Sequence, residues 1–136
     1  MIVYQETLEN VTPAQLTGFF VGWPQPPSPE THYRLLEGSQ HVVLARDTEP
    51  EQVVGFVTAI SDGVLCAYIP LLEVLPAYQG RGIGSALVRR LLAQLEGLYM
   101  IDLLCDAEVQ PFYERLGLRP ATGMMRRDYA TLQGET

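Results

Sequence analysis

Three things are scarce in this chain of 136 residues: lysine, cysteine and long apolar runs. Lysine is absent altogether, which excludes a phosphate-binding loop of the Walker type, because that loop ends in Gly-Lys-Ser or Gly-Lys-Thr. No apolar run reaches the roughly 18 residues that a membrane-spanning helix needs. The start, MIVYQETLEN, lacks the basic and apolar stretches of a signal peptide. We therefore expect a single domain over residues 1–136, cytoplasmic and without a membrane partner.

The cysteines indicate the redox state of the protein, and the charge indicates which classes of ligand it favours. Cys66 and Cys105 lie in apolar runs, and a chain of this size needs no disulfide, so we interpret both as reduced core thiols. The net charge of −7 argues against a nucleic acid as partner. Residues 1–80 carry the whole acidic excess, whereas residues 81–136 hold seven arginines and seven acidic residues. The second half therefore favours an anionic ligand and the first half a cationic one, although ordinary solubilising surface charge explains the same split.

Hydrophobic periodicity predicts strands and helices in the order β-α-α-β-β-β-α-β-α-β. The expected strands are residues 1–6, 41–47, 52–60, 64–74, 99–106 (buried on both faces) and 118–129 (a strand or hairpin). The expected helices are residues 13–20, 29–36, a stretch after the glycines at 80–84 that stops at Gly97, and 109–116, with a loose end at 131–136. Pro70 lies inside the expected strand 64–74 and indicates an edge, a bulge or a splay there.

The stretch YQGRGIGS, residues 78–85, is the most distinctive feature of the sequence. Gly80, Gly82 and Ser85 approximate the dinucleotide fingerprint G-x-G-x-x-G, and Asp102 follows about 20 residues later. That fingerprint normally opens its domain, whereas more than half of the chain precedes it here. A nicotinamide-cofactor enzyme is therefore the weakest of the interpretations that we weigh.

A second interpretation uses more of the chain. EVLPAYQGRGIGSALVRRLL resembles motif A of the GNAT acyltransferases, V-x-P-x-x-(Q/R)-x-x-G-x-(G/A), and DAEVQPFYERLGL resembles the second signature of that family. The matching positions of motif A are Val74, Pro76, Gln79, Gly82 and Gly84. The resemblance implies the α/β (α+β) GNAT fold, with a mixed, mostly antiparallel sheet of about six to seven strands and helices on both faces.

The resemblance also implies acetyl-CoA as the cosubstrate and no metal. Free backbone N–H groups at the start of a helix form an anion cradle, which suits a pyrophosphate. The residues expected to bind the cofactor are Leu72, Val74, Gln79, Gly80, Arg81, Gly82, Ile83, Gly84, Ser85 and Asp106. Asp106 stands where the family usually has Asn, and an ionised Asp cannot donate a hydrogen bond.

The implied reaction is direct attack by a primary amine on the acetyl thioester. In the family a tyrosine of the second signature often protonates the departing thiolate, and Tyr113 holds that position here. Glu73 is unusual in the apolar run PLLEVLP, where it could act as general base or attract a cationic substrate. The alternative for Tyr113 is simple packing, and for Glu73 a solvent-facing side chain.

The acceptor pocket implied by the resemblance comes from the first two helices and their loop. Trp23, Phe20, Tyr33 and Tyr68 are the candidates to line it, although Phe20 could equally belong to the core. The expected acceptor is an amine of a small molecule or a peptide, and the family often forms homodimers. The alternative function is a catalytically degenerate member of this fold that binds CoA as a sensor or regulatory module.

Overall fold

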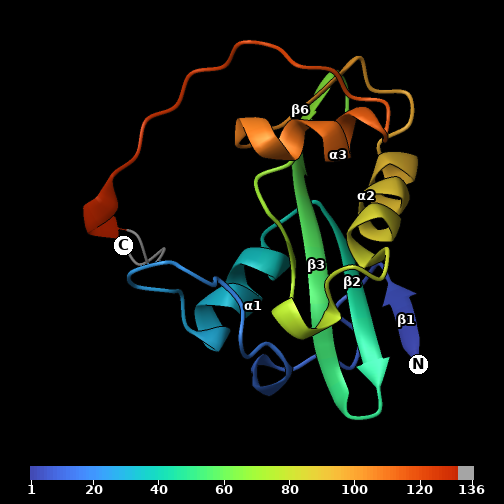
Figure 1. Cartoon of the computed structure of the whole chain (residues 1–136), viewed down its shortest axis with the longest axis vertical. Coiled ribbons are helices and arrows are strands. Elements are labelled where there is room, and N and C mark those ends of the chain that lie inside the picture. Colours follow the sequence, from blue (N-terminus) through green and yellow to red (C-terminus); the bar gives the residue numbers. More distant parts are fainter. Residues whose placement is uncertain (132–136) are drawn as a thin grey trace.

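The computed structural model describes residues 1–131, which form one six-stranded sheet with helices packed against it (Figure 1). The strands are β1 (Ile2–Gln5), β2 (His41–Thr48), β3 (Glu51–Ser61), β4 (Cys66–Tyr68), β5 (Leu72–Val74) and β6 (Met100–Asp102). The α-helices are α1 (Pro29–Glu37), α2 (Ile83–Gln94) and α3 (Gln110–Glu114). Short 3₁₀ turns are η1 (Pro13–Gln15), η2 (Pro76–Tyr78), η3 (Ala107–Val109) and η4 (Tyr129–Thr131).

The sheet is mostly antiparallel, as expected. Its order is β1-β2-β3-β4-β6, and β5 also pairs with β3. Each pairing is antiparallel except that of β4 with β6, which is parallel. The long hairpin of β2 and β3 is its centre, and these two strands supply most of the fully buried side chains.

Helices cover both faces of the sheet because successive side chains of β3 point to opposite sides. A Cβ placed on Gly55 would lie 3.0 Å from Leu87 of α2, so this face of β3 packs against α2. The next residue, Phe56, packs its ring 4.4 Å from the ring of His32 in α1. Figure 1 shows the two helices on either side of β3. The predicted fold class is therefore confirmed.

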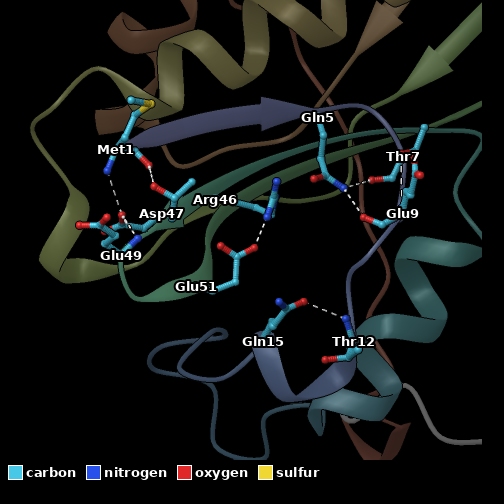
Figure 2. Close-up of polar contacts among 11 residues, drawn as sticks. Met1, Gln5, Thr7, Glu9, Thr12, Gln15, Arg46, Asp47, Glu49 and Glu51 are labelled. Atoms are coloured by element: carbon cyan, nitrogen blue, oxygen red, sulfur yellow. Dashed lines mark hydrogen bonds and ion pairs between the residues drawn. The ribbon is translucent and has the colours of Figure 1, made fainter.

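The N-terminal half follows the prediction in part. Helix α1 begins as expected, because Ser28 accepts a hydrogen bond from the N–H of Thr31 (3.1 Å), a typical N-cap. The helix expected over residues 13–20 is wrong: only η1 forms, closed by the side chain of Gln15 accepting from Thr12 (Figure 2). Gly18 and Phe20 have φ angles of 90° and 63°, which a right-handed helix does not allow.

The second half differs more from the prediction. Helix α2 is confirmed, but α3 is shorter than the helix expected over residues 109–116. The strand expected over 99–106 is reduced to β6, and it is not buried on both faces, since Met100 and Asp102 are exposed. No strand forms within the described part of 118–129. Residues 132–136 lie outside the described part, so the loose end expected at 131–136 is described only at Thr131.

No helix among residues 1–131 is both long and apolar enough to cross a membrane.

Candidate active site

The expected strand over residues 64–74 is split in two, and the split opens the sheet. β4 pairs with β3 on one side and with β6 on the other, whereas β5 pairs with β3 alone. The ladder with β6 ends at the hydrogen bond from the Ile69 N–H to the Asp102 carbonyl (2.9 Å). Pro70 follows at once, and by alternation its missing N–H falls on the side of β3, where the pairing register shifts between Ile60↔Tyr68 and Val57↔Leu72. The disturbance predicted at Pro70 is therefore present, and it leaves one side of β5 without a neighbouring strand.

The alternation of the backbone identifies which groups face this gap. The carbonyl of Leu71 and the N–H of Leu75 bond to β3, at 3.1 and 2.9 Å. Backbone groups of successive strand residues point to opposite sides, so those of Leu72 and Val74 point away from β3. The side-chain amide of Gln79 donates to the Val74 carbonyl (3.0 Å). The N–H groups of Leu72 and Val74 and the Leu72 carbonyl therefore face the gap.

The glycine loop lies between β5 and α2 and ends in free amides. Gly80 and Gly82 have φ angles of 78° and 80°, a region that strongly favours glycine, and nothing lies within 4 Å of where their Cβ atoms would be. The first hydrogen bond of α2 runs from Ala86 to the carbonyl of Gly82 (3.1 Å), so the three N–H groups before Ala86 have no partner within the helix. The N–H of Gln79 donates to Pro76 (3.3 Å) and is not free.

A network of contacts around Tyr78 and Asp47 fixes the start of the glycine loop. The Tyr78 hydroxyl donates to the Asp47 carboxylate (2.7 Å), and the Arg81 guanidinium lies 5.0 Å from the centre of the Tyr78 ring. Figure 2 shows that Asp47 also accepts hydrogen bonds from Glu49 and Met1. The hydrogen bond from Tyr78 is the largest reason why the pKa of Asp47 is lowered to about 2. The start of the loop is thus tied to the end of β2, which the sequence pattern did not indicate.

Glu73 connects β5 to the loop that precedes α1. Its two carboxylate oxygens accept hydrogen bonds from the Phe20 N–H (2.9 and 3.0 Å), and one also accepts from the Val21 N–H (3.3 Å). These bonds hold Phe20 in its left-handed conformation, with φ of 63°. Glu73 is therefore neither a free carboxylate nor a solvated side chain but the anchor of this loop.

The candidate acceptor residues divide into core and surface. Phe20 is buried at 3% exposure and packs against Trp23 and His32, with ring centres 5.0 and 4.9 Å away. Trp23 is 38% exposed, and Tyr33 is half-buried. Trp23 therefore exposes an aromatic surface on the loop that Glu73 anchors, and the buried Phe20 ring packs against it. His32 has both ring nitrogens buried without a partner, and burial lowers its pKa to about 4.

Tyr113 and Tyr68 line a second region, a cavity of about 960 Å³ between β6, α3 and the residues that follow α3. Tyr113 is buried, and burial is the main cause that raises its pKa to about 12, with the nearby Cys105 as a smaller cause. Burial is also the largest cause that raises the pKa of Cys105. The residue as a whole is exposed, so the expectation that Cys105 is a core thiol is wrong. Tyr68 is 39% exposed.

Contacts across α2 and α3 link this cavity to the loop. A Cβ on Gly84 would lie 3.5 Å from the Phe112 ring and 3.9 Å from Val74. The Phe112 ring in turn packs edge-on against Tyr113 (4.9 Å). Asp106 is exposed at the start of η3, and its side chain caps nothing there. The loop, Val74 and Phe112 thus lie together on the α2 face of the sheet, with Tyr113 next to Phe112. Glu73, Phe20 and Trp23 lie on the α1 face, and Tyr68 lines the cavity with Tyr113.

Comparison with known proteins identifies the family. The sequence pattern of the Acetyltransferase (GNAT) family matches residues 8–118. The chain therefore belongs to the GNAT family of acetyltransferases.

Solved structures and characterised relatives add detail. A proposed acetyltransferase from Deinococcus radiodurans R1 is 55% identical, and the match covers 99% of this chain and 94% of that one with a TM-score of 0.96. A histone acetyltransferase from Glycine max, TAP1, is 32% identical over 71% of this chain. A chloroplastic serotonin N-acetyltransferase from Oryza sativa subsp. japonica is 36% identical over 62% of it. The chain spans 46% and 44% of the length of these two plant relatives.

Proposed function

We propose that this chain is an N-acetyltransferase that transfers an acetyl group from acetyl-CoA to a primary amine by direct attack on the thioester. The observation that carries this proposal is the side of β5 left unpaired beside the free amides that begin α2. An extended molecule with an anionic end fits such a surface, because the strand offers hydrogen bonds along its length and the helix start favours negative charge.

The residues present fit coenzyme A in two respects. The loop amides from Arg81 to Ser85 and the positive end of α2 suit a pyrophosphate, and the two left-handed glycines leave its approach open. The outward groups of Leu72 and Val74 suit the amides of a pantetheine arm. When bound, acetyl-CoA supplies the activated acetyl group. No cluster of metal-ligating side chains is present among residues 1–131.

The chemistry that this chain contributes is polarisation and proton supply. A strand N–H that faces the gap, at Leu72 or Val74, can donate to the thioester carbonyl and stabilise negative charge on its oxygen. The Tyr113 hydroxyl carries a proton at neutral pH, as an ordinary tyrosine does, and can give it to the leaving thiolate. Burial raises the pKa of Tyr113 to about 12, so it is a weaker acid than a free tyrosine. We assign Glu73 to positioning: it orients the loop that carries Trp23 and adds negative charge beside the acceptor path.

The acceptor that these features favour is a cationic primary amine of a small molecule or a peptide. The acidic first half of the chain and the exposed ring of Trp23 both attract a cation. The relatives named above are named for histones and for serotonin, both of which carry primary amines. We propose that the protein acts in the cytoplasm as a single domain over 1–136 and as a homodimer.

Thiol release across a panel of primary amines tests the proposal. We expect acetyl-CoA, but not NAD, to raise the melting temperature, because a ligand that binds the folded state stabilises it. We expect turnover with at least one cationic amine and none with the matched alcohols. Binding of CoA without turnover on the whole panel would instead support the sensor function.

A further inference from the structure

The exposed part of the glycine loop, residues 79–82, is held at both of its ends. Ile83, the first residue of α2, is buried at 3% exposure. At the other end, Tyr78 packs against the core and its hydroxyl donates to the Asp47 carboxylate (2.7 Å). Every residue between these two anchors is exposed. The course of the loop therefore depends on the anchors rather than on packing of its own side chains.

The glycines of this span make it more dependent on the anchors. Gly80 and Gly82 have left-handed φ angles, and nothing lies within 4 Å of where their Cβ atoms would be. Glycine has more backbone freedom than any other residue, so a loop held at one end only would take many courses. An anion binds well only where several amides point at it together, so each alternative course lowers the fraction of molecules that are ready to bind.

The place of Asp47 in β2 directs its carboxylate toward the start of α2. Ala45 pairs with Gly55, and a Cβ on Gly55 would contact Leu87 of α2. Side chains two residues apart in a strand point to the same face, so Asp47 also lies on the α2 face of the sheet. Asp47 is buried at 8% exposure, and a buried carboxylate needs hydrogen-bond donors.

The three donors to the Asp47 carboxylate differ in what they connect. Met1 and Glu49 (3.2 and 3.0 Å) flank strands that their ladders already join (Figure 2). Among residues 1–131, only Tyr78 reaches this carboxylate from the glycine loop. Its bond is short, as hydrogen bonds to a charged acceptor are. Loss of this bond would leave the sheet closed and release the loop.

Tyr78 also limits where Arg81 lies. The Arg81 guanidinium stands 5.0 Å from the centre of the Tyr78 ring and donates to the Ala77 carbonyl (3.3 Å). A cation over an aromatic ring is attracted to its face, so a fixed ring keeps this positive charge at the loop. Asp47 therefore acts on both the amides and the one guanidinium that the loop carries, through a single tyrosine.

We propose that Asp47 is a positioning residue for acetyl-CoA: through the Tyr78 hydroxyl it holds the glycine loop so that the amides of residues 81–85 converge on the diphosphate. Asp47 itself touches neither the cofactor nor the acceptor. Its loss lowers the affinity for the cofactor and leaves acetyl transfer at saturation unchanged. The proposal rests on the N-acetyltransferase function proposed above, because it takes the loop as the diphosphate site.

Tyr78→Phe tests this contact most cleanly, because it removes the hydroxyl and keeps the ring beneath Arg81. We expect the Kd for CoA, measured by titration calorimetry, to rise about fivefold, as for a loop that holds its binding geometry about a fifth of the time. The KM for acetyl-CoA should rise by the same factor with kcat unchanged. The kcat/KM for S-acetylpantetheine, which lacks the diphosphate, should stay at the wild-type value.

The matched control is Tyr4→Phe. The Tyr4 ring lies beneath Arg90 of α2 (4.6 Å), much as the Tyr78 ring lies beneath Arg81, but Tyr4 belongs to β1 and not to the loop. This variant should leave the Kd for CoA and both kinetic constants unchanged. A rise in Kd equal to that of Tyr78→Phe would show that any lost tyrosine hydroxyl has the same effect, and would overturn the proposal.

A double-mutant cycle assigns the effect to Asp47. Asp47→Asn should also raise the Kd for CoA, and D47N/Y78F should bind CoA as Asp47→Asn alone does, because both changes remove the same hydrogen bond. Additive losses in the double variant, an equal loss with S-acetylpantetheine, or wild-type affinity in Tyr78→Phe would overturn the proposal. If Asp47→Asn does not fold, the comparison of the two donors in Tyr78→Phe decides alone.

The wild-type protein separates a failure of this proposal from a failure of the proposed function. Wild-type protein that does not bind CoA would overturn both. Wild-type protein that binds CoA but acetylates no amine would overturn only the proposed activity, and the Kd values of the variants would still decide the role of Asp47. Wild-type turnover together with unchanged Kd and KM in Tyr78→Phe would overturn the role of Asp47 alone.

Discussion

β4 and β5 were expected as one strand, yet the two halves have opposite surroundings. β4 is paired on both sides, whereas β5 has a partner on one side only. The halves are otherwise alike: each has three residues, and each is joined to a carboxylate that accepts backbone N–H groups, Asp62 before β4 and Glu73 within β5. Each also has a left-handed glycine nearby, Gly63 before β4 and Gly82 after β5. The difference in pairing shows that the candidate site arises where a strand loses a neighbour.

This symmetry supplies a matched control on β4 for each change on the β5 side. If the unpaired half is the functional one, changes around it should alter catalysis, and equivalent changes around β4 should alter kcat and the KM for acetyl-CoA far less.

The largest expected effect is that of Tyr113→Phe, compared with Tyr68→Phe on β4. Loss of the Tyr113 hydroxyl removes the proposed proton donor and should lower kcat by about 10²-fold. Tyr68→Phe keeps the ring and should change the KM for the amine without a comparable loss of kcat. Steady-state kinetics with acetyl-CoA and the best amine measures both. Equal losses of kcat in the two variants would remove Tyr113 from its assigned role.

Acid should destabilise the surroundings of His32 and those of Asp62 at different pH values. The pKa of His32 is about 4 in the folded protein against 6.5 unfolded, so the unfolded state binds the proton more readily. The neutral ring therefore stabilises the fold above pH 6.5, and roughly 3 kcal/mol is lost as the pH falls toward 4. Backbone N–H groups of Val64, Leu65 and Cys66 lower the pKa of Asp62 to about 2 from 3.8, so its contribution is lost only as the pH falls from 3.8 through 2.

Trp23, the one tryptophan, reports the first of these steps. It packs on Phe20, which contacts His32, so its fluorescence should change near pH 4, where His32 takes up a proton in the folded protein. His32→Leu removes the titrating group and should shift that change to lower pH. A fluorescence titration that is the same in both proteins would show that His32 does not control this loop.

A smaller effect is expected from Gly82→Val, with Gly63→Val as its control. Both glycines have left-handed φ angles, 80° and 75°, with open space around them, so each substitution should cost about 1–2 kcal/mol of stability. Only Gly82→Val disturbs the loop amides, and it should raise the KM for acetyl-CoA about tenfold, the equivalent of one charge-assisted hydrogen bond. If Gly63→Val raised this KM equally, the effect would be general instability.

The smallest effect is expected from Glu73→Gln, compared with Asp62→Asn. The amide retains one acceptor oxygen but loses the charge, so the loop of Trp23 should loosen and the KM for the amine should rise a few-fold, with kcat little changed. Asp62→Asn should lower the melting temperature and leave both constants alone. A collapse of kcat in Glu73→Gln would show that Glu73 is the general base rather than a positioning residue.

Local sequence rules predicted the parts of the fold that depend on neighbours in the chain. The face of Leu87, Val88 and Leu91 indicates α2, and Ser28 marks the start of α1, because periodicity and capping act over a few residues. Pro70 indicated the break in the strand because a missing N–H is a property of the residue itself.

Features that depend on distant contacts could not be predicted in this way. The pattern of residues 118–129 is that of a strand, but a strand needs a paired neighbour, and the described chain supplies none. The hydrogen bonds of Glu73 to Phe20 join residues 53 positions apart, and the hydrogen bond of Tyr78 to Asp47 joins residues 31 positions apart. Such contacts decide whether a carboxylate is free, and no spacing rule in the sequence encodes them.

The most direct test of the central claim is the backbone amide spectrum of ¹⁵N-labelled protein titrated with acetyl-CoA. The account predicts that the amides of Leu72, Val74 and residues 81–85 shift, while those of β4 keep their positions. Shifts confined to β4, β6 or the cavity beside Tyr113, with the loop amides unmoved, would contradict it.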